Sequence, residues 1–180
     1  MDDLILKAAR FAARQHTGQS RKYTARPYVT HPARVAAMAM LLPDADPPLV
    51  CAALLHDVIE DCGVTAEQLA AEFGSDVASI VDELTNRSKL ESPGANRAQR
   101  KALDRARLKN VSRRAKLLKL LDRIDNLREM DLAPSGFRRK YLDESRLLLE
   151  EVLSGVEPNL EAELLAEIKR HEGMLALERA

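Results

Sequence analysis

Residues 49–61 read LVCAALLHDVIED, and this stretch decides the fold. A run of apolar residues passes directly into His56 and Asp57, and Glu60 and Asp61 follow about one turn later. Such an apolar run must be buried in the core of a globular domain. Charged groups at its end are costly to bury unless something compensates them, and a divalent cation is the simplest compensation.

Helical spacing predicts how the four polar groups of this stretch lie relative to one another. Glu60 lies four residues after His56, and Asp61 lies four residues after Asp57. In one continuous helix, all four side chains can therefore point toward the same end, with the later pair one turn beyond the first. We expect a helix that opens at Asp46, continues through residues 49–61 and carries this polar cluster on its last turns.

An isolated His56–Asp57 pair more often caps or salt-bridges a core helix than binds a metal. Two further residues favour the metal interpretation. His31 lies at an expected helix start, and Asp122 ends the run LLKLLD of residues 117–122, so each puts a ligand-capable group on an apolar segment. The resulting order (His, His-Asp, Asp) resembles the signature of the HD superfamily, in which two imidazoles and two carboxylates hold a divalent metal.

More specifically, the chain resembles the hydrolase domain of the RelA/SpoT family and its stand-alone small alarmone hydrolases. The match spans roughly residues 4–153. Its blocks are HTGQSRKYTARPYVTHPARVA at 16–36, AALLHDVIEDCGVT at 52–65, FGSDVASIVDELT at 73–85 and KLLDRIDNLREM at 119–130. The HDVIED motif is specific, because generic HD phosphohydrolases keep His-Asp without the Glu-Asp pair that follows it here.

The composition favours one all-α domain. Aromatic residues make up 3% of the chain, Trp is absent, and runs of β-branched residues are missing. Together with the resemblance, this predicts a single-domain HD-type helical bundle with a metal site between helices. Residues 1–154 are expected to form the hydrolase domain. Residues 155–180 are expected to form a C-terminal amphipathic helix, packed on the domain or on a second subunit.

Proline, glycine and capping residues divide the chain into further helices joined by short loops. Residues 18–27 and 86–95 are expected to be polar loops, the first of them basic. The helices are expected over residues 4–15, 32–42, 65–74, 76–84 (with Ser75 as its cap), 96–109, 112–130, 135–153 and 158–177.

Carried over position by position, the resemblance implies a metal site and a substrate site. The implied metal ligands are His31, His56, Asp57 and Asp122. The family favours Mn²⁺, and other divalent transition metals fit the same groups. Glu60 and Asp61 are implied to position or deprotonate the attacking water. Arg21 and Lys22 match the family's nucleotide-contacting basic pair, and Asn126 matches its ribose contact.

Two positions depart from the family pattern. Ala25 stands where many relatives carry Gly, and Asp125 stands where alarmone hydrolases often carry His or Tyr. We place Asp125 on the wall of the nucleotide pocket. The roles of Lys119, Arg123 and Lys140 stay open between substrate contact and ordinary helix charges.

The resemblance implies hydrolysis of the 3′-pyrophosphate of guanosine tetra- and pentaphosphate to GDP or GTP plus pyrophosphate. Two alternatives stay open: an HD phosphohydrolase of another nucleotide (a nucleoside monophosphate, (p)ppApp or NADPH), and a non-catalytic alarmone-binding protein. With Lys+Arg and Asp+Glu at 28 each, no nucleic-acid or membrane partner is expected. A cytoplasmic location is expected because no apolar stretch approaches the roughly 20 residues that a membrane span needs. A homo-oligomer is left open.

Overall fold

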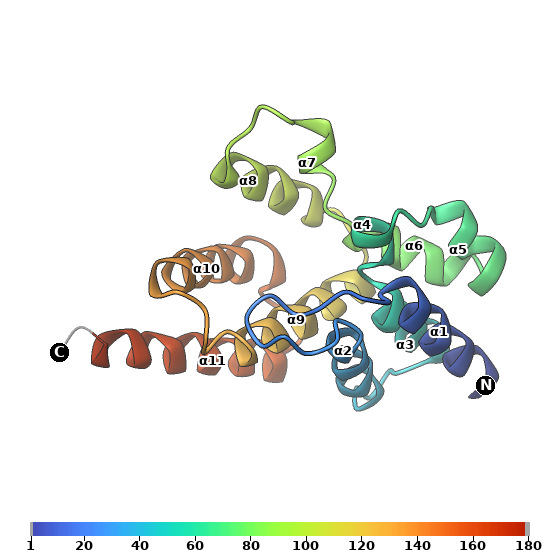
Figure 1. The fold of residues 1–180 in the computed structure, drawn as a ribbon, viewed down its shortest axis with the longest axis horizontal. Helices are drawn as coiled ribbons and strands as arrows, with labels where there is room; N and C mark the ends of the chain where they lie inside the picture. The colour runs from blue at the N-terminus through green and yellow to red at the C-terminus, as the bar shows by residue number, and fades with distance from the viewer. Residues whose placement is uncertain (1, 179–180) are drawn as a thin grey trace.

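The computed structural model describes residues 2–178, which form helices joined by short loops (Figure 1). The helices are α1 (Asp2–Gln15), α2 (Thr30–Met40), α3 (Pro47–Leu55), α4 (Val58–Cys62), α5 (Ala66–Phe73), α6 (Ser75–Leu84), α7 (Ser88–Glu91), α8 (Arg97–Leu108), α9 (Arg113–Arg128), α10 (Ser135–Leu148), the π-helix η1 (Leu149–Leu153) and α11 (Pro158–Leu177). Within the described range there is no strand, only an isolated bridge between Ser20 and Pro27. The all-α prediction is confirmed.

Several helix ends follow the capping residues that the sequence supplies. The Asp46 carboxylate accepts a hydrogen bond of 2.9 Å from the backbone N–H of Leu49 and so begins α3. Thr65 and Gln68 form a reciprocal capping box at the start of α5. Gly63 ends α4 with a φ of 72°, a left-handed conformation that glycine adopts without strain.

The single helix expected over residues 49–61 is wrong, because the helical hydrogen-bond pattern breaks at His56 and Asp57, although both keep right-handed backbone angles. Nδ1 of His56 donates to the carbonyl oxygen of Ala53 at 2.8 Å. In a continuous helix that oxygen would accept from the backbone N–H of Asp57. The imidazole thus replaces a backbone hydrogen bond, and both residues lie in a turn between α3 and α4.

Helix α9 runs through the middle of the molecule, with α1, α3, α5 and α6 toward one end and α10 and α11 toward the other (Figure 1). Leu118 and Leu121 belong to the core on the first side. Ile124 and Leu127 belong to a second core, to which α11 contributes by packing on α9 and α10. Because α9 is covered on several sides, most of the polar residues near its middle are buried as well.

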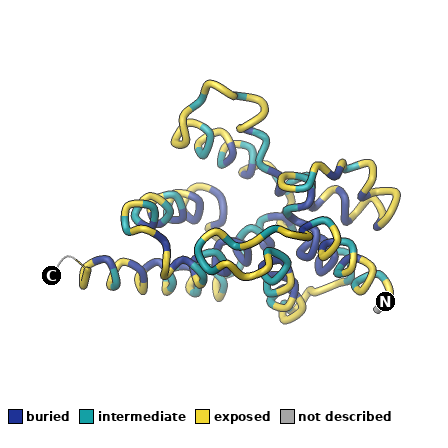
Figure 2. The backbone as a smooth tube through the Cα atoms, in the orientation of Figure 1, coloured by how far each residue is buried: buried dark blue, intermediate teal, exposed yellow. Residues whose placement is uncertain are grey.

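Helices α7 and α8 project from the body of the molecule and are largely exposed (Figures 1 and 2). Only Asp104 and Leu108 of α8 are buried. The loop expected over residues 86–95 contains the short helix α7, and the helix expected over residues 135–153 changes to π geometry in its last five residues. Helix α8 therefore contributes to the core only through Leu108.

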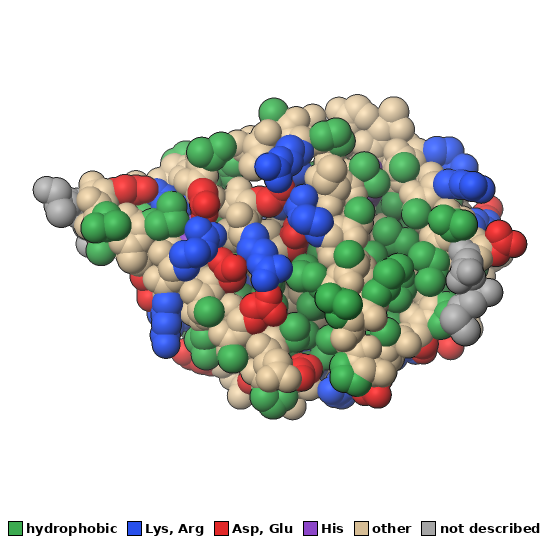
Figure 3. All heavy atoms as spheres, turned by 90° about the horizontal axis from the view of Figure 1, so that it is seen from below, with side chains coloured by type: hydrophobic (Ala, Val, Ile, Leu, Met, Phe, Trp, Pro, Cys, Tyr) green, Lys and Arg blue, Asp and Glu red, His purple; other side chains and the backbone are tan. Residues whose placement is uncertain are grey.

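The surface carries charges of both signs. On the face seen from below, acidic and basic side chains intermingle toward the C-terminal end, and hydrophobic side chains gather toward the N-terminal end (Figure 3). Many of the chain's surface charges are paired: Arg128 contacts Glu163 and Glu167. Arg170 contacts Asp131 at 2.8 Å. Among the described helices, none combines the length and the hydropathy needed to cross a membrane.

Candidate functional site

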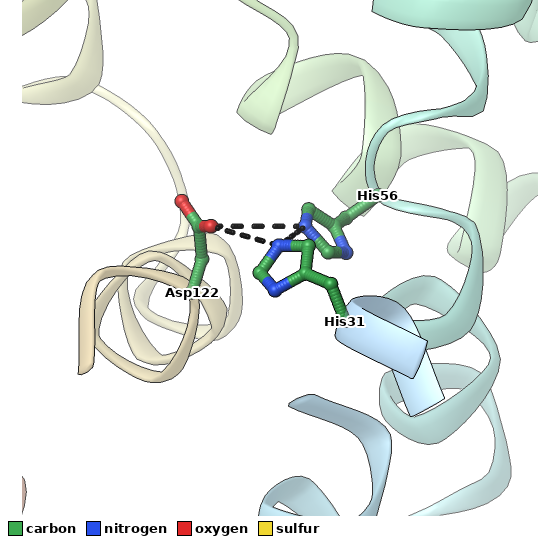
Figure 4. Close-up of side chains that lie close together, drawn as sticks. All are labelled: His31, His56 and Asp122. Atoms are coloured by element: carbon green, nitrogen blue, oxygen red, sulfur yellow. Dashed lines mark hydrogen bonds and ion pairs between the residues drawn. The ribbon is translucent and has the colours of Figure 1, made fainter. Parts of the chain in front are cut away.

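Three ligand-capable side chains meet where α2, α9 and the turn after α3 come together (Figure 4). His31, His56 and Asp122 are all buried, and one ligand atom of each lies within 4.8 Å of the others. The two Nε2 atoms are 3.2 Å apart. Asp122 Oδ1 lies 3.3 Å from Nε2 of His31 and 3.8 Å from Nε2 of His56. This converging set of nitrogen and oxygen donors suits a divalent transition metal.

Asp57 lies beside these three residues, but it does not belong to the group whose ligand atoms all lie within 4.8 Å of one another. Its Oδ2 is 3.1 Å from Nε2 of His56 and 3.7 Å from Nε2 of His31. The same oxygen accepts a hydrogen bond of 2.6 Å from the hydroxyl of Tyr28. Asp57 therefore faces both imidazoles, and Tyr28 fixes its orientation. Tyr28 is not among the residues predicted from the sequence, because its position carries no local signal.

The electrostatics of this cluster favour charged groups of opposite sign. Burial alone would lower the pKa of His56, but Asp57 and Asp122 outweigh it and raise the pKa to about 9. The pKa of His31 is raised against burial in the same way, chiefly by Asp122. Burial opposes ionisation of Asp57, but the histidines lower its pKa. For Asp122, Lys119 and the histidines lower the pKa against burial. The raised pKa values of both histidines reflect the carboxylates around them, and a divalent cation would balance that negative charge at the same place.

The predicted catalytic pair lies on α4, outside the group of converging ligand atoms. Glu60 Oε2 accepts two hydrogen bonds from Asn86, one from the backbone N–H at 3.2 Å and one from the side-chain amide at 2.8 Å. Glu60 and Asp61 are both exposed by surface area, but the surrounding protein partly desolvates their carboxyl groups. This desolvation raises the pKa of Glu60 and of Asp61, and the Asp57 charge adds to it. A raised pKa makes a carboxylate a stronger base.

The three predicted substrate residues, Arg21, Lys22 and Asn126, line one cavity of about 260 Å³. All three tyrosines of the chain and one of its three phenylalanines line it too. Lys22 Nζ lies 5.3 Å from the ring centroid of Tyr23 and 5.6 Å from that of Phe137. Aromatic rings beside cations suit a nucleobase with attached phosphates. The complete lining is Ser20, Arg21, Lys22, Tyr23, Thr24, Tyr28, Asn126, Glu129, Met130, Phe137 and Tyr141.

Asn126 connects this cavity to the histidine–aspartate cluster. Its side-chain Nδ2 donates to Asp122 Oδ1 at 2.5 Å, and its Oδ1 accepts from Nη2 of Arg21 at 2.6 Å. Nε of Arg21 donates to Glu129 Oε2 at 2.8 Å. One amide thus links a predicted metal ligand to a predicted substrate residue.

Asp125 does not line the nucleotide cavity, contrary to the sequence-based expectation. It is 1% exposed, and its Oδ2 lies 2.7 Å from Nδ1 of His31. Arg34 donates to its two oxygens at 2.6 and 2.9 Å. Because Asp125 follows Asp122 by three residues, both lie on one face of α9. That spacing is the signal that would have placed Asp125 beside the metal site.

Basic residues gather on another side of Asp122, between α8, α9 and α10. Lys119 Nζ lies 2.9 Å from Asp122 Oδ2, and Arg123 is buried. Burial, together with the Lys119 and Arg123 charges, lowers the pKa of Lys101. A neighbouring cavity of about 510 Å³ is lined by Lys101 and also by Lys140. Desolvated cations this close to one another favour an anionic ligand.

The helical bundle and its buried histidine–aspartate cluster define a class: HD-type proteins with a site for a divalent metal. The model of the family described as "HD domain" matches residues 8–148. The chain belongs to this family.

Relatives with named activities cover almost the whole chain. A guanosine-3′,5′-bis(diphosphate) 3′-pyrophosphohydrolase MESH1 of Xenopus tropicalis is 36% identical over 156 residues, which is 85% of this chain and 84% of that protein. The MESH1 of Drosophila melanogaster is 35% identical over 95% of this chain and 96% of its own length. A solved structure described as a metazoan ortholog of SpoT that hydrolyzes ppGpp superposes with a TM-score of 0.79, at 33% identity, over 94% of this chain and 96% of that one.

Proposed function

We propose that this protein is a metal-dependent hydrolase that removes the 3′-pyrophosphate of guanosine tetra- and pentaphosphate, yielding GDP or GTP plus pyrophosphate. The observation that carries the proposal is the link through Asn126, which bonds both Asp122 and Arg21. A nucleotide held in the aromatic cavity would present its ribose next to the cluster of ligand atoms. The named activity of the Xenopus and Drosophila relatives supports this substrate.

The proposed metal is Mn²⁺. Its proposed ligands are His31, His56, Asp57 and Asp122. A mixed set of nitrogen and oxygen donors without a thiolate suits this ion. When bound, the cation lowers the pKa of water and neutralises charge on the phosphoryl oxygens.

Glu60 and Asp61 orient the attacking water and accept its proton. Asn86 holds the Glu60 carboxylate, and the raised pKa of both groups suits proton transfer. Water adds to the phosphorus attached to the ribose 3′ oxygen, and the bond between that phosphorus and the 3′ oxygen breaks. The proton that the carboxylate pair took from water passes to the 3′ oxygen, which leaves as the ribose hydroxyl. Both phosphates leave together as pyrophosphate, and the nucleoside 5′-phosphates are untouched.

The remaining charges of the substrate need cations of the chain. Arg21 and Lys22 hold the nucleotide in the cavity, and Asn126 contacts its ribose. We assign Lys119 and Arg123 to the phosphoryl side, since Lys119 lies next to Asp122 and both cations, together with Lys101, line a small cavity there. Lys140, together with Lys101, lines the neighbouring cavity of about 510 Å³.

For the domain organisation, we propose residues 1–154 as the catalytic domain and residues 155–180 as a helix that covers it. The packing of α11 on α9 and α10 of the same chain supports this arrangement. Met1 and residues 179–180 lie outside the described range.

The test is a substrate panel with purified protein and Mn²⁺. It contains guanosine 3′,5′-bis(diphosphate), its adenosine counterpart, nucleoside monophosphates and NADPH. We expect the guanosine compound to be cleaved fastest, with no cleavage by Asp122→Ala and normal cleavage by the control Asp131→Ala, an exposed carboxylate beyond the end of α9. Preferred release of inorganic phosphate from a monophosphate or from NADPH would replace the proposal by the broader HD phosphohydrolase.

A further inference from the structure

Asp125 has the smallest exposed surface of any carboxylate among the described residues, at 1%. A buried carboxylate is costly unless hydrogen bonds and opposite charge compensate it. Here the compensation comes from two sides: Nδ1 of His31 at 2.7 Å and the Arg34 guanidinium at 2.6 and 2.9 Å. Asp125 therefore holds a residue of the metal cluster on one oxygen while a cation clamps both oxygens.

This contact decides where the His31 proton lies. A carboxylate can only accept hydrogen bonds, so Nδ1 of His31 must donate. When the other nitrogen, Nε2, gives up its proton, its lone pair faces His56 and Asp122. A ligating imidazole requires this arrangement, with its second nitrogen fixed by an acceptor. We propose that Asp125 is a positioning residue that fixes the tautomer and ring orientation of His31 for metal binding.

The hydrogen bonds continue from Asp125 toward the substrate cavity. Nη2 of Arg34 also lies 2.7 Å from Glu129 Oε2, and Arg21 donates to that same oxygen at 2.8 Å. Arg21 lines the cavity in which the nucleotide is proposed to bind. Asp125 thus contacts the predicted metal ligand His31 directly. It is also connected to the predicted substrate residue Arg21 through the side chains of Arg34 and Glu129.

A purely structural role for Asp125 makes a different prediction. If the carboxylate served only to neutralise Arg34, its loss would lower thermal stability and leave metal affinity unchanged. A positioning role requires a change in metal affinity that stability does not explain. This inference rests on the metal site of the proposed function, but it can be measured without any nucleotide.

The sharpest variant is Asp125→Asn, which keeps the shape. Both oxygens of Asp125 accept hydrogen bonds, whereas an amide replaces one of them by an NH2 group that can only donate. Either orientation of the amide therefore sets its NH2 group against a donor of His31 or Arg34. We expect the Kd for Mn²⁺ alone, from calorimetric titration, to weaken by about 10- to 100-fold. The matched control is Asp104→Asn, which changes a second buried carboxylate, on α8. This variant should bind Mn²⁺ like the wild type. Wild-type affinity in folded Asp125→Asn would overturn the proposal.

A second measurement needs no variant and so does not depend on Asp125→Asn folding. In wild-type protein loaded with diamagnetic Zn²⁺, ¹⁵N NMR of the histidine rings should show a proton on Nδ1 of His31 that is protected from exchange. A proton-free Nδ1 would overturn the proposal. Loss of the proposed function would look different: a wild type that binds metal and passes both tests, yet cleaves no nucleotide.

Discussion

His31 and His56 point their Nε2 atoms at each other across 3.2 Å, although 25 positions separate them in the chain. Two imidazoles this close cannot both carry a proton there without strong neighbouring negative charge, which Asp57 and Asp122 supply. A metal ion and these protons therefore compete for the same space.

The competition predicts how metal affinity depends on pH. The carboxylates raise the pKa of His56 from 6.5 to about 9, so at neutral pH metal binding must displace a proton. The apparent affinity for Mn²⁺ should rise by about tenfold per pH unit for each proton displaced and level off above a pH of about 9. Titrations under anaerobic conditions between a pH of about 6 and 9 would measure this slope.

The metal-free protein provides the control, because its stability should change in the opposite direction. Because the pKa of His56 is higher in the folded state, its protonation stabilises the fold. This stabilisation is complete below the unfolded pKa of 6.5 and is lost as the pH rises through the folded pKa of about 9. Thermal melts of metal-free protein should therefore shift down over this range. A pH-independent metal affinity together with flat melts would show that His56 does not hold a proton in the cluster.

Glu60→Gln and Asp61→Asn separate metal binding from chemistry. Each keeps the size of the side chain and removes the carboxylate that is proposed to accept the proton of water. We expect kcat to fall by roughly 10² to 10⁴ while bound Mn²⁺, measured by elemental analysis, stays stoichiometric. An unchanged kcat would remove the pair from the mechanism, and loss of the metal would reassign the residues to its binding.

Arg21→Ala and Lys22→Ala should weaken substrate binding without affecting the metal. Each removes a cation from the cavity lining, so KM for guanosine tetraphosphate should rise by about tenfold or more, the usual worth of a hydrogen bond to a charged group. Arg26→Ala is the matched control: this arginine of the same loop is mostly exposed and outside the lining. Equal effects of all three substitutions would point to loop charge in general rather than to a nucleotide site.

Ala25 is the one non-glycine residue with a positive φ among the described residues, at 54°. A side chain in this left-handed region costs about 1 kcal/mol, a cost that glycine does not carry. Ala25→Gly should therefore raise the free energy of unfolding by up to about 1 kcal/mol, seen as a Tm increase of about 2–4 °C. The matched control, Ala98→Gly on the exposed surface of α8, should lower the Tm instead. A lower Tm for Ala25→Gly would contradict the strained loop.

The sequence was sufficient for those features that depend on local chemistry. Asp46 and Thr65 predicted helix starts correctly, because an N-cap side chain bonds a backbone N–H only two or three residues further along the chain. His31, His56 and Asp122 stood out because each interrupts an apolar segment, and the structure brings these three together. Their meeting follows from burial, since polar groups on apolar helix faces must share one interior.

Other features depend on contacts that local patterns do not encode. The turn at His56 arises from a side chain that takes a backbone acceptor, whereas local propensity favours a continuous helix. The Asp125–His31 contact spans 94 positions, and Tyr28 reaches Asp57 from a loop. Such partners become visible only after α2 has packed on α9.

The most direct test of the central claim is the identity of the products formed from guanosine 3′,5′-bis(diphosphate). The reaction of wild-type protein with Mn²⁺ is stopped by chelation, and the products are separated by anion exchange. Metal-free protein and the Asp57→Ala and Asp122→Ala variants are treated in the same way as controls. The proposed reaction gives GDP and pyrophosphate in equal amounts from the loaded wild type and neither product from the others. Stepwise release of inorganic phosphate, or cleavage by Asp122→Ala that equals the wild type, would contradict it.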